Sequence, residues 1–265
     1  MPTKKLTRFV AIMSLLVLKL SSSPNDAVAG LYQVCDVAAD YALGAEDYTS
    51  AIRLHLEVLR NHPDNALAHY HLGFAIGIIG DTRGELGEYK RAEDLGLTNW
   101  DLFLNLGLAQ LESGDLNAAA DSLKRSVLFG ESHSEAHFDL ALVEQRRGML
   151  AEAEKEAIAS LRLNPAQADA RDLLGVIYAE EGKDVLASAV WRELTRDVPD
   201  YEPARANLAL LCSSRGAVVA RRRWSLNPSL PGGVQTPLEN RRNCQGFLDS
   251  ARSLRAKQGT VGARP

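Results

Sequence analysis

The chain has 265 residues, 46% of them hydrophobic and 24% charged, which is enough for one or two globular cores and excludes a fibrous or wholly disordered protein. Its formal net charge of -4 is unevenly distributed, because residues 30–212 hold 16 Lys and Arg against 31 Asp and Glu, whereas residues 213–265 hold 10 against 2. An acidic body therefore carries a basic tail, and the acidic body disfavours nucleic acid as a partner.

Residues 1–29 have the pattern of a secretory signal peptide. Lys4, Lys5 and Arg8 precede an apolar run at 9–18, and small residues precede a cleavage point after Ala29. We therefore expect export to a periplasm or an extracellular space, with no membrane span left after cleavage. The alternative is an uncleaved N-terminal membrane anchor, but the apolar run is about half of the roughly 20 residues that a spanning helix needs.

From residue 32 onward the sequence repeats with a period of 34 residues. The predicted blocks are 32–65, 66–99, 100–133, 134–167 and 168–201, followed by a shorter block at 202–212. The eighth position of each block is small, and it reads Ala39, Gly73, Gly107, Ala141, Gly175 and Ala209. The fifteenth position reads Gly80, Gly114, Gly148, Gly182 and Gly216 from the second block on. The twentieth position reads Ala51, Ala119, Ala153 and Ala187, with Glu85 as the exception.

This pattern predicts two helices in each block. Positions four, seven, eight and eleven lie on one face of a helix, so that face is expected to be buried. A small eighth residue lets a neighbouring helix approach closely, and the glycine at position fifteen ends the first helix in a left-handed turn. The first block departs from the pattern, because Glu46 stands where the turn glycine belongs.

These residues resemble the tetratricopeptide repeat (TPR) family. The third block matches its motif with Phe103, Leu106, Gly107, Ala119 and Leu123, and the fifth with Leu174, Gly175, Tyr178, Ala187, Trp191 and Pro199. The resemblance implies an all-α fold, a right-handed α-solenoid of five helix-turn-helix repeats and a capping helix, within residues 30–212. It also implies a non-enzymatic scaffold that binds a partner on a concave surface lined by the first helices.

The face opposite the packed positions carries an apolar stripe flanked by carboxylates. The predicted partner-binding anchors are Tyr70, Phe74, Leu104, Leu108, Phe138 and Leu142. The predicted acidic flank is Asp36, Asp40, Asp101, Glu135 and Asp172. Such a groove favours a protein or peptide with apolar and basic residues. The alternatives are that superhelical curvature buries the stripe as core, or that the chain's own basic tail lies in the groove.

The sequence predicts no enzyme, cofactor or metal site. His133 and His137 have the spacing of a zinc pair, but a helix boundary is expected between them and the adjacent Glu of a catalytic zinc motif is missing. Cys35, Cys212 and Cys244 have no recognisable spacing, and only Cys212 with Cys244 is a plausible disulfide.

The tail at 213–265 is predicted to be disordered, because it is rich in charge and poor in apolar residues. Its arginines favour an acidic partner, an anionic envelope surface or the chain's own groove. An alternative function is that the array is an accessory subunit of an enzyme complex that assembles cell-wall or other envelope polysaccharide.

Overall fold

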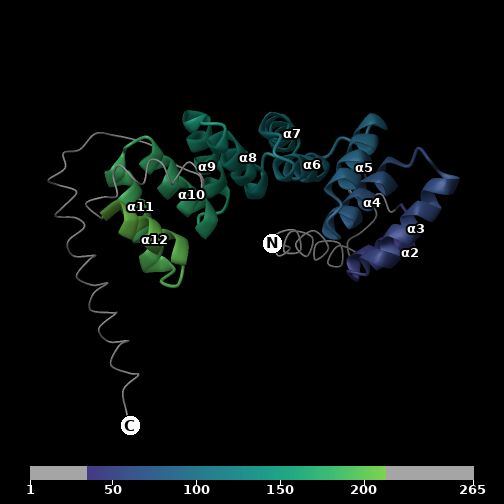
Figure 1. Cartoon of the computed structure of the whole chain (residues 1–265), viewed down its shortest axis with the longest axis horizontal. Helices are drawn as coiled ribbons and strands as arrows, with labels where there is room; N and C mark the ends of the chain where they lie inside the picture. The colour runs from purple at the N-terminus through teal and green to yellow at the C-terminus, as the bar shows by residue number, and fades with distance from the viewer. Residues whose placement is uncertain (1–34, 213–265) are drawn as a thin grey trace, which may run out of the picture. The chain divides into compact units, whose positions relative to one another are not determined.

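A computed structural model of the chain describes residues 35–212, and these residues form eleven helices and no strand (Figure 1). The predicted signal peptide at 1–29, the predicted tail at 213–265 and the possible partner Cys244 lie outside the described residues. Among the helices that the structure describes, none has both the length and the apolar character needed to cross a membrane.

The described chain falls into two compact units that divide between Phe129 and Gly130. The first unit contains α2 (Val37–Gly44), α3 (Tyr48–Asn61), α4 (Ala66–Ile78), α5 (Thr82–Asp94), α6 (Trp100–Glu112) and α7 (Leu116–Phe129). The second unit contains α8 (Ser134–Arg146), α9 (Leu150–Leu163), α10 (Ala168–Glu180), α11 (Asp184–Asp197) and α12 (Glu202–Cys212). Each 34-residue block holds one helix pair, and the last block holds α12 alone. The predicted fold class is therefore confirmed.

Short polar side chains fix where several helices begin. Asp47 accepts a hydrogen bond from the backbone N–H of Ser50 at the start of α3, and Asn65 accepts one from Ala68 at the start of α4. These side chains satisfy N–H groups that the first turn of a helix leaves without a partner, and each such cap contributes about 1 kcal/mol. The helix boundaries therefore follow from local sequence.

Glycine at position eight of a block allows the two helices of a pair to pack closely. A Cβ atom added to Gly107 on α6 would lie 2.7 Å from Cγ of Leu123 on α7, and one added to Gly73 would lie 2.8 Å from Cδ1 of Tyr89. Both distances are below a normal carbon–carbon contact. Ala119 at position twenty is fully buried beside this contact, as the repeat pattern predicts.

The turns between paired helices show why Glu46 is an exception. Gly114 has a φ of 86° in the turn between α6 and α7, a left-handed conformation that glycine adopts without strain. Glu46 occupies the corresponding turn between α2 and α3 with a φ of 61°, and among the described residues it is the one non-glycine residue with positive φ. A side chain in this conformation costs about 1 kcal/mol.

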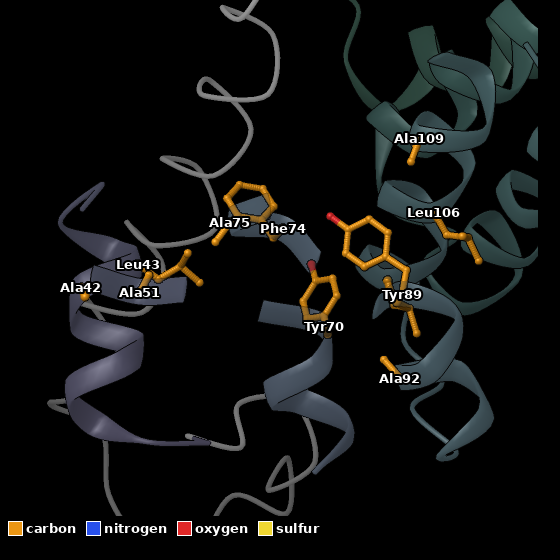
Figure 2. Packing of buried hydrophobic residues seen from close by; sticks show 11 residues of the cluster. Ala42, Leu43, Ala51, Tyr70, Phe74, Ala75, Tyr89, Ala92, Leu106 and Ala109 are labelled. Atoms are coloured by element: carbon orange, nitrogen blue, oxygen red, sulfur yellow. The ribbon is translucent and has the colours of Figure 1, made fainter. Parts of the chain in front are cut away.

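The core of the first unit lies between its helix pairs. Tyr70 and Tyr89 pack with their ring centroids 5.8 Å apart, and Phe74, Leu106 and Ala109 belong to the same buried cluster (Figure 2). Two predicted anchors, Tyr70 and Phe74, are thus part of this core.

Candidate functional site

The structure buries most of the predicted apolar stripe. Tyr70, Phe74, Leu104 and Phe138 expose only 7, 7, 4 and 8% of their surfaces. At these four positions the burial supports the alternative in which the stripe is core, because a side chain with so little exposed area offers almost no contact surface. That they bind a partner stays a prediction.

Leu108 on α6 and Leu142 on α8 are the two predicted anchors that remain partly exposed. Leu142 packs at the margin of a cluster that includes Phe138 and Leu173, so part of its side chain is held by the second unit's core. Glu135 is exposed in the first turn of α8, the same helix as Leu142. In each unit, therefore, one of the predicted anchors stays partly exposed on the first helix of a repeat.

Asp101 in the acidic flank is engaged within the first unit. The hydroxyl of Tyr70 donates to Oδ2 of Asp101 at 3.2 Å, and Nδ2 of Asn105 donates to the Tyr70 oxygen at 2.8 Å. Burial raises the pKa of Asp101, although the hydrogen bonds from the Tyr70 hydroxyl and from the backbone N–H of Leu102 act in the opposite direction. Asp101 thus joins two successive repeats instead of standing free beside the stripe.

Asp172 occupies an environment of neutral donors in the second unit. Its Oδ1 accepts hydrogen bonds from Nε1 of Trp191 on α11 at 2.8 Å and from Nδ2 of Asn207 on α12 at 3.0 Å. Burial raises the pKa of Asp172 to about 6, because neither neighbour brings a positive charge to compensate for the lost hydration.

Asp36 has a structural role at the start of α2. Its Oδ1 accepts hydrogen bonds from the backbone N–H groups of Ala38 at 3.0 Å and Ala39 at 2.9 Å. This is the geometry of a helix N-cap, and it accounts for an aspartate at this position without a ligand.

Asp40 lies in a polar cluster that the sequence did not predict. Its Oδ1 lies 2.7 Å from Nδ1 of His71, 3.3 Å from Nε2 of His55 and 3.3 Å from Sγ of Cys35. Burial alone would raise the pKa of Asp40, but the hydrogen bonds with His55 and His71 outweigh it and hold the pKa well below its usual range. Burial, together with the adjacent Asp40 carboxylate, raises the pKa of the Cys35 thiol well above its usual value.

Hydrogen bonds between successive repeats join residues that lie 35 positions apart in the sequence. Tyr70 with Asn105 and Asp172 with Asn207 are both hydrogen-bonded pairs separated by 35 residues. Position six of a block therefore meets position five of the block before it. His71 occupies position six of the second block, but its partner Asp40 lies at position nine of the first block and not at position five, which is Asp36.

His137, one of the two histidines with the spacing of a zinc pair, has other partners. Nδ1 of His137 lies 2.7 Å from Oε2 of Glu156, and its Nε2 lies 3.3 Å from the carbonyl oxygen of Glu131. His69 repeats this arrangement with Glu88 and with the carbonyl oxygen of Pro63. Because α8 begins at Ser134, the predicted helix boundary between His133 and His137 is confirmed.

Comparison with known proteins agrees with this architecture. The family model described as tetratricopeptide repeat matches residues 37–75 and 104–161. Among solved structures, YrrB, a TPR protein with an unusual peptide-binding site, is 25% identical, with a TM-score of 0.60 over 63% of this chain and 86% of that one. The Pseudomonas aeruginosa protein pilF is 20% identical, with a TM-score of 0.56 over 72% of this chain and 89% of that one, which shows a shared fold.

A curated relative extends the comparison to a larger protein. The human protein O-mannosyl-transferase TMTC3 is 26% identical over 167 residues, which are 62% of this chain but only 18% of that protein. The chain thus spans less than a fifth of the length of this relative. The 34-residue period, the helix pairs, the family model and the matching structures together show that residues 35–212 have the fold of the tetratricopeptide repeat family.

Proposed function

We propose that this chain is a non-enzymatic scaffold that binds a peptide or helix of a partner protein on the first helices of its repeats. The observation that carries the proposal is the TPR fold, with a likeness at 25% identity to a TPR protein that has a peptide-binding site. Helical repeats suit this role, because within each unit every repeat adds a further first helix to a shared face.

Leu108 in the first unit and Leu142 in the second are the anchors that we propose, each for a partner segment that binds on its own unit. They are the members of the predicted stripe that keep exposed surface, whereas the buried members hold the underlying helices in place. The exposed carboxylate of Glu135 lies on the same helix as Leu142. The partner segment should therefore combine apolar side chains with basic ones.

The proposal is tested with peptides selected from a random library on the immobilised full chain. The affinity of these peptides is then measured for the wild-type chain, for a double variant and for a control variant. The variant carrying both Leu108→Asp and Leu142→Asp should lose at least about tenfold in affinity, because each substitution places a charge in an apolar contact. The control is Leu128→Asp, which changes a leucine on the second helix α7 that is already 68% exposed. Equal affinity for all three proteins would contradict the proposal, provided that circular dichroism shows unchanged helix content.

A second candidate function is supported by the resemblance to part of TMTC3. In this view the repeats serve as the accessory region of an enzyme complex, for example one that assembles envelope polysaccharide. Purification of the complex from its native source distinguishes the two candidates. Stable co-purification with a glycosyltransferase would favour the accessory role, and retention of short peptide segments alone would favour the first proposal.

We further propose that the chain is exported after removal of residues 1–29. The support is the charged, apolar and small-residue pattern of this segment. N-terminal sequencing of the protein from its native source should then begin at Gly30. A chain that still carries residues 1–29 in the membrane fraction would favour the uncleaved anchor.

A further inference from the structure

Four side chains of different chemical types converge in the first unit. Sγ of Cys35, one carboxylate oxygen of Asp40 and one ring nitrogen each of His55 and His71 all lie within 4.8 Å of one another. Cys35 directly precedes the α2 region, Asp40 lies on α2, His55 on α3 and His71 on α4. We propose that these residues form a Zn²⁺ site that fastens the first repeat to the second.

The spacing of the four atoms suits a tetrahedral ion. Zinc binds sulfur at about 2.3 Å and nitrogen or oxygen at about 2.0–2.2 Å, so neighbouring ligand atoms in a tetrahedral site lie roughly 3.3–3.8 Å apart. The distances from Asp40 Oδ1 to Cys35 Sγ and to His55 Nε2 are both 3.3 Å, and Cys35 Sγ lies 3.8 Å from His71 Nδ1. The 2.7 Å distance from Asp40 Oδ1 to His71 Nδ1 would lengthen as the ion separates them.

The protonation of His55 gives a reason for a cation at this point. Its Nδ1 lies 2.8 Å from the carbonyl oxygen of Ala51, which can only accept, so Nδ1 carries a proton. Nε2 lies 3.3 Å from Oδ1 of Asp40, and these two atoms can bond only through a proton or a cation between them. A metal ion can take the place of that proton, with one bond to each atom.

The surroundings also hold the ligands in suitable orientations. The bond from His55 Nδ1 to the Ala51 carbonyl fixes the ring, as the second nitrogen of a metal-binding histidine commonly requires. The backbone N–H of Cys35 donates to Oδ2 of Asp40 at 3.1 Å, which leaves Oδ1 directed at the cluster. His55 is fully buried, so its Nε2 is not available to bulk water.

A catalytic cysteine does not account for the same geometry. A nucleophilic triad needs one ring nitrogen of histidine on the thiol and the other on the carboxylate. Here Cys35 Sγ and Asp40 Oδ1 both approach Nδ1 of His71, so His71 cannot relay a proton between them. Convergence of several ligand atoms on one point is instead the arrangement of a metal site.

The ligand types favour zinc over the harder cations. A thiolate and two imidazoles are poor ligands for Mg²⁺ and Ca²⁺, which prefer oxygen, and four protein ligands are typical of a closed structural zinc site. Cu²⁺ also binds such groups, and usually more tightly in direct competition. The test therefore includes displacement by zinc.

The experiment titrates the reduced, metal-free full chain with Co²⁺, a spectroscopic substitute for zinc. We expect one equivalent to bind with visible d–d bands and a near-ultraviolet sulfur-to-cobalt charge-transfer band, and Zn²⁺ to bleach both with a dissociation constant below about 1 µM. Cys35→Ser should remove the charge-transfer band, and His71→Gln should weaken binding at least about tenfold. His69→Gln is the matched control, because His69 lies on the same helix and pairs with Glu88 outside the cluster.

Two measurements on the unaltered chain keep the proposal testable if a variant misfolds. Saturating Zn²⁺ should protect the Cys35 thiol from alkylation. At 100 times the dissociation constant it should raise Tm by about 5–10 °C. A charge-transfer band that persists in Cys35→Ser, cobalt that zinc cannot displace, or alkylation of Cys35 at an unchanged rate would overturn the assignment.

Discussion

Asp40 in the first unit and Asp172 in the second are both carboxylates of the predicted acidic flank, yet their surroundings have opposite effects. Two histidine rings contact Asp40, and they hold its pKa below the usual range. Asp172 receives hydrogen bonds from the neutral Trp191 and Asn207, and its pKa rises to about 6. The pKa of a carboxylate is therefore set by the residues that neighbouring helices place beside it, and not by its position in the repeat.

The largest effect that separates the two regions is expected for Asp40→Asn. This change removes the negative charge of Asp40, which both His55 and His71 contact, and it leaves the ring nitrogens of these histidines without their carboxylate partner. We expect a loss of about 3 kcal/mol in the free energy of unfolding at pH 7. Urea denaturation measures the loss, and faster hydrogen exchange should be confined to α2, α3 and α4.

The control for this prediction is Asp64→Asn, an exposed carboxylate of the same unit, which should change stability by less than about 0.5 kcal/mol. Equal effects of the two substitutions would show that the cluster does not depend on the Asp40 charge.

The same substitution at Asp172 should act in the opposite direction. In Asp172→Asn the amide side chain would keep an oxygen for the N–H groups of Trp191 and Asn207 but would carry no buried charge. A pKa of about 6 against an ordinary 3.8 implies a gain of about 1–3 kcal/mol at pH 7. The exposed Asp200 supplies the control substitution, and a loss of stability in Asp172→Asn would contradict the comparison.

The stability contribution of Asp172 should also depend on pH. Because its pKa is higher in the folded state than in the unfolded one, the folded state binds more protons between about pH 4 and pH 6. Stability from this group therefore falls as pH rises through that window, by about 1–3 kcal/mol, and then levels off. The difference between the unfolding free energies of the wild type and Asp172→Asn, measured from pH 4 to pH 8, should follow this curve. A difference that does not vary with pH would refute it.

The smallest effect concerns the turn between α2 and α3, which carry Asp40 and His55. Glu46→Gly should stabilise the first unit by about 0.5–1 kcal/mol, because glycine adopts the φ of 61° without strain. Gly114→Ala, in the equivalent turn of another repeat, should destabilise by a similar amount. Thermal unfolding compares the two, and a loss of stability in Glu46→Gly would show that its side chain makes a compensating contact.

The repeat pattern predicted the fold from sequence because each of its positions has one packing role. Gly107 against Leu123 and the left-handed Gly114 are where a 34-residue period places them. Long-range contacts were harder to predict. The repeat pattern places Tyr70 on the exposed face, but the next repeat covers it, and Nδ2 of Asn105 donates to its hydroxyl oxygen.

The cluster of Cys35, Asp40, His55 and His71 cannot be predicted by comparing equivalent positions of the repeats. Its members come from the segment before one helix and from three successive helices, and each occupies a different position of the repeat. Only the packing of the first two repeats brings them together.

The most direct test of the proposed scaffold role is site-specific photo-crosslinking in the native host. A photoreactive amino acid is placed singly at Leu108, at Leu142 and at the control Leu128, and the crosslinked products are identified by mass spectrometry. We expect partner segments rich in apolar and basic residues to crosslink at positions 108 and 142 and not at 128. Crosslinking only at 128, or equally at all three positions, would contradict binding on the first helices of the repeats.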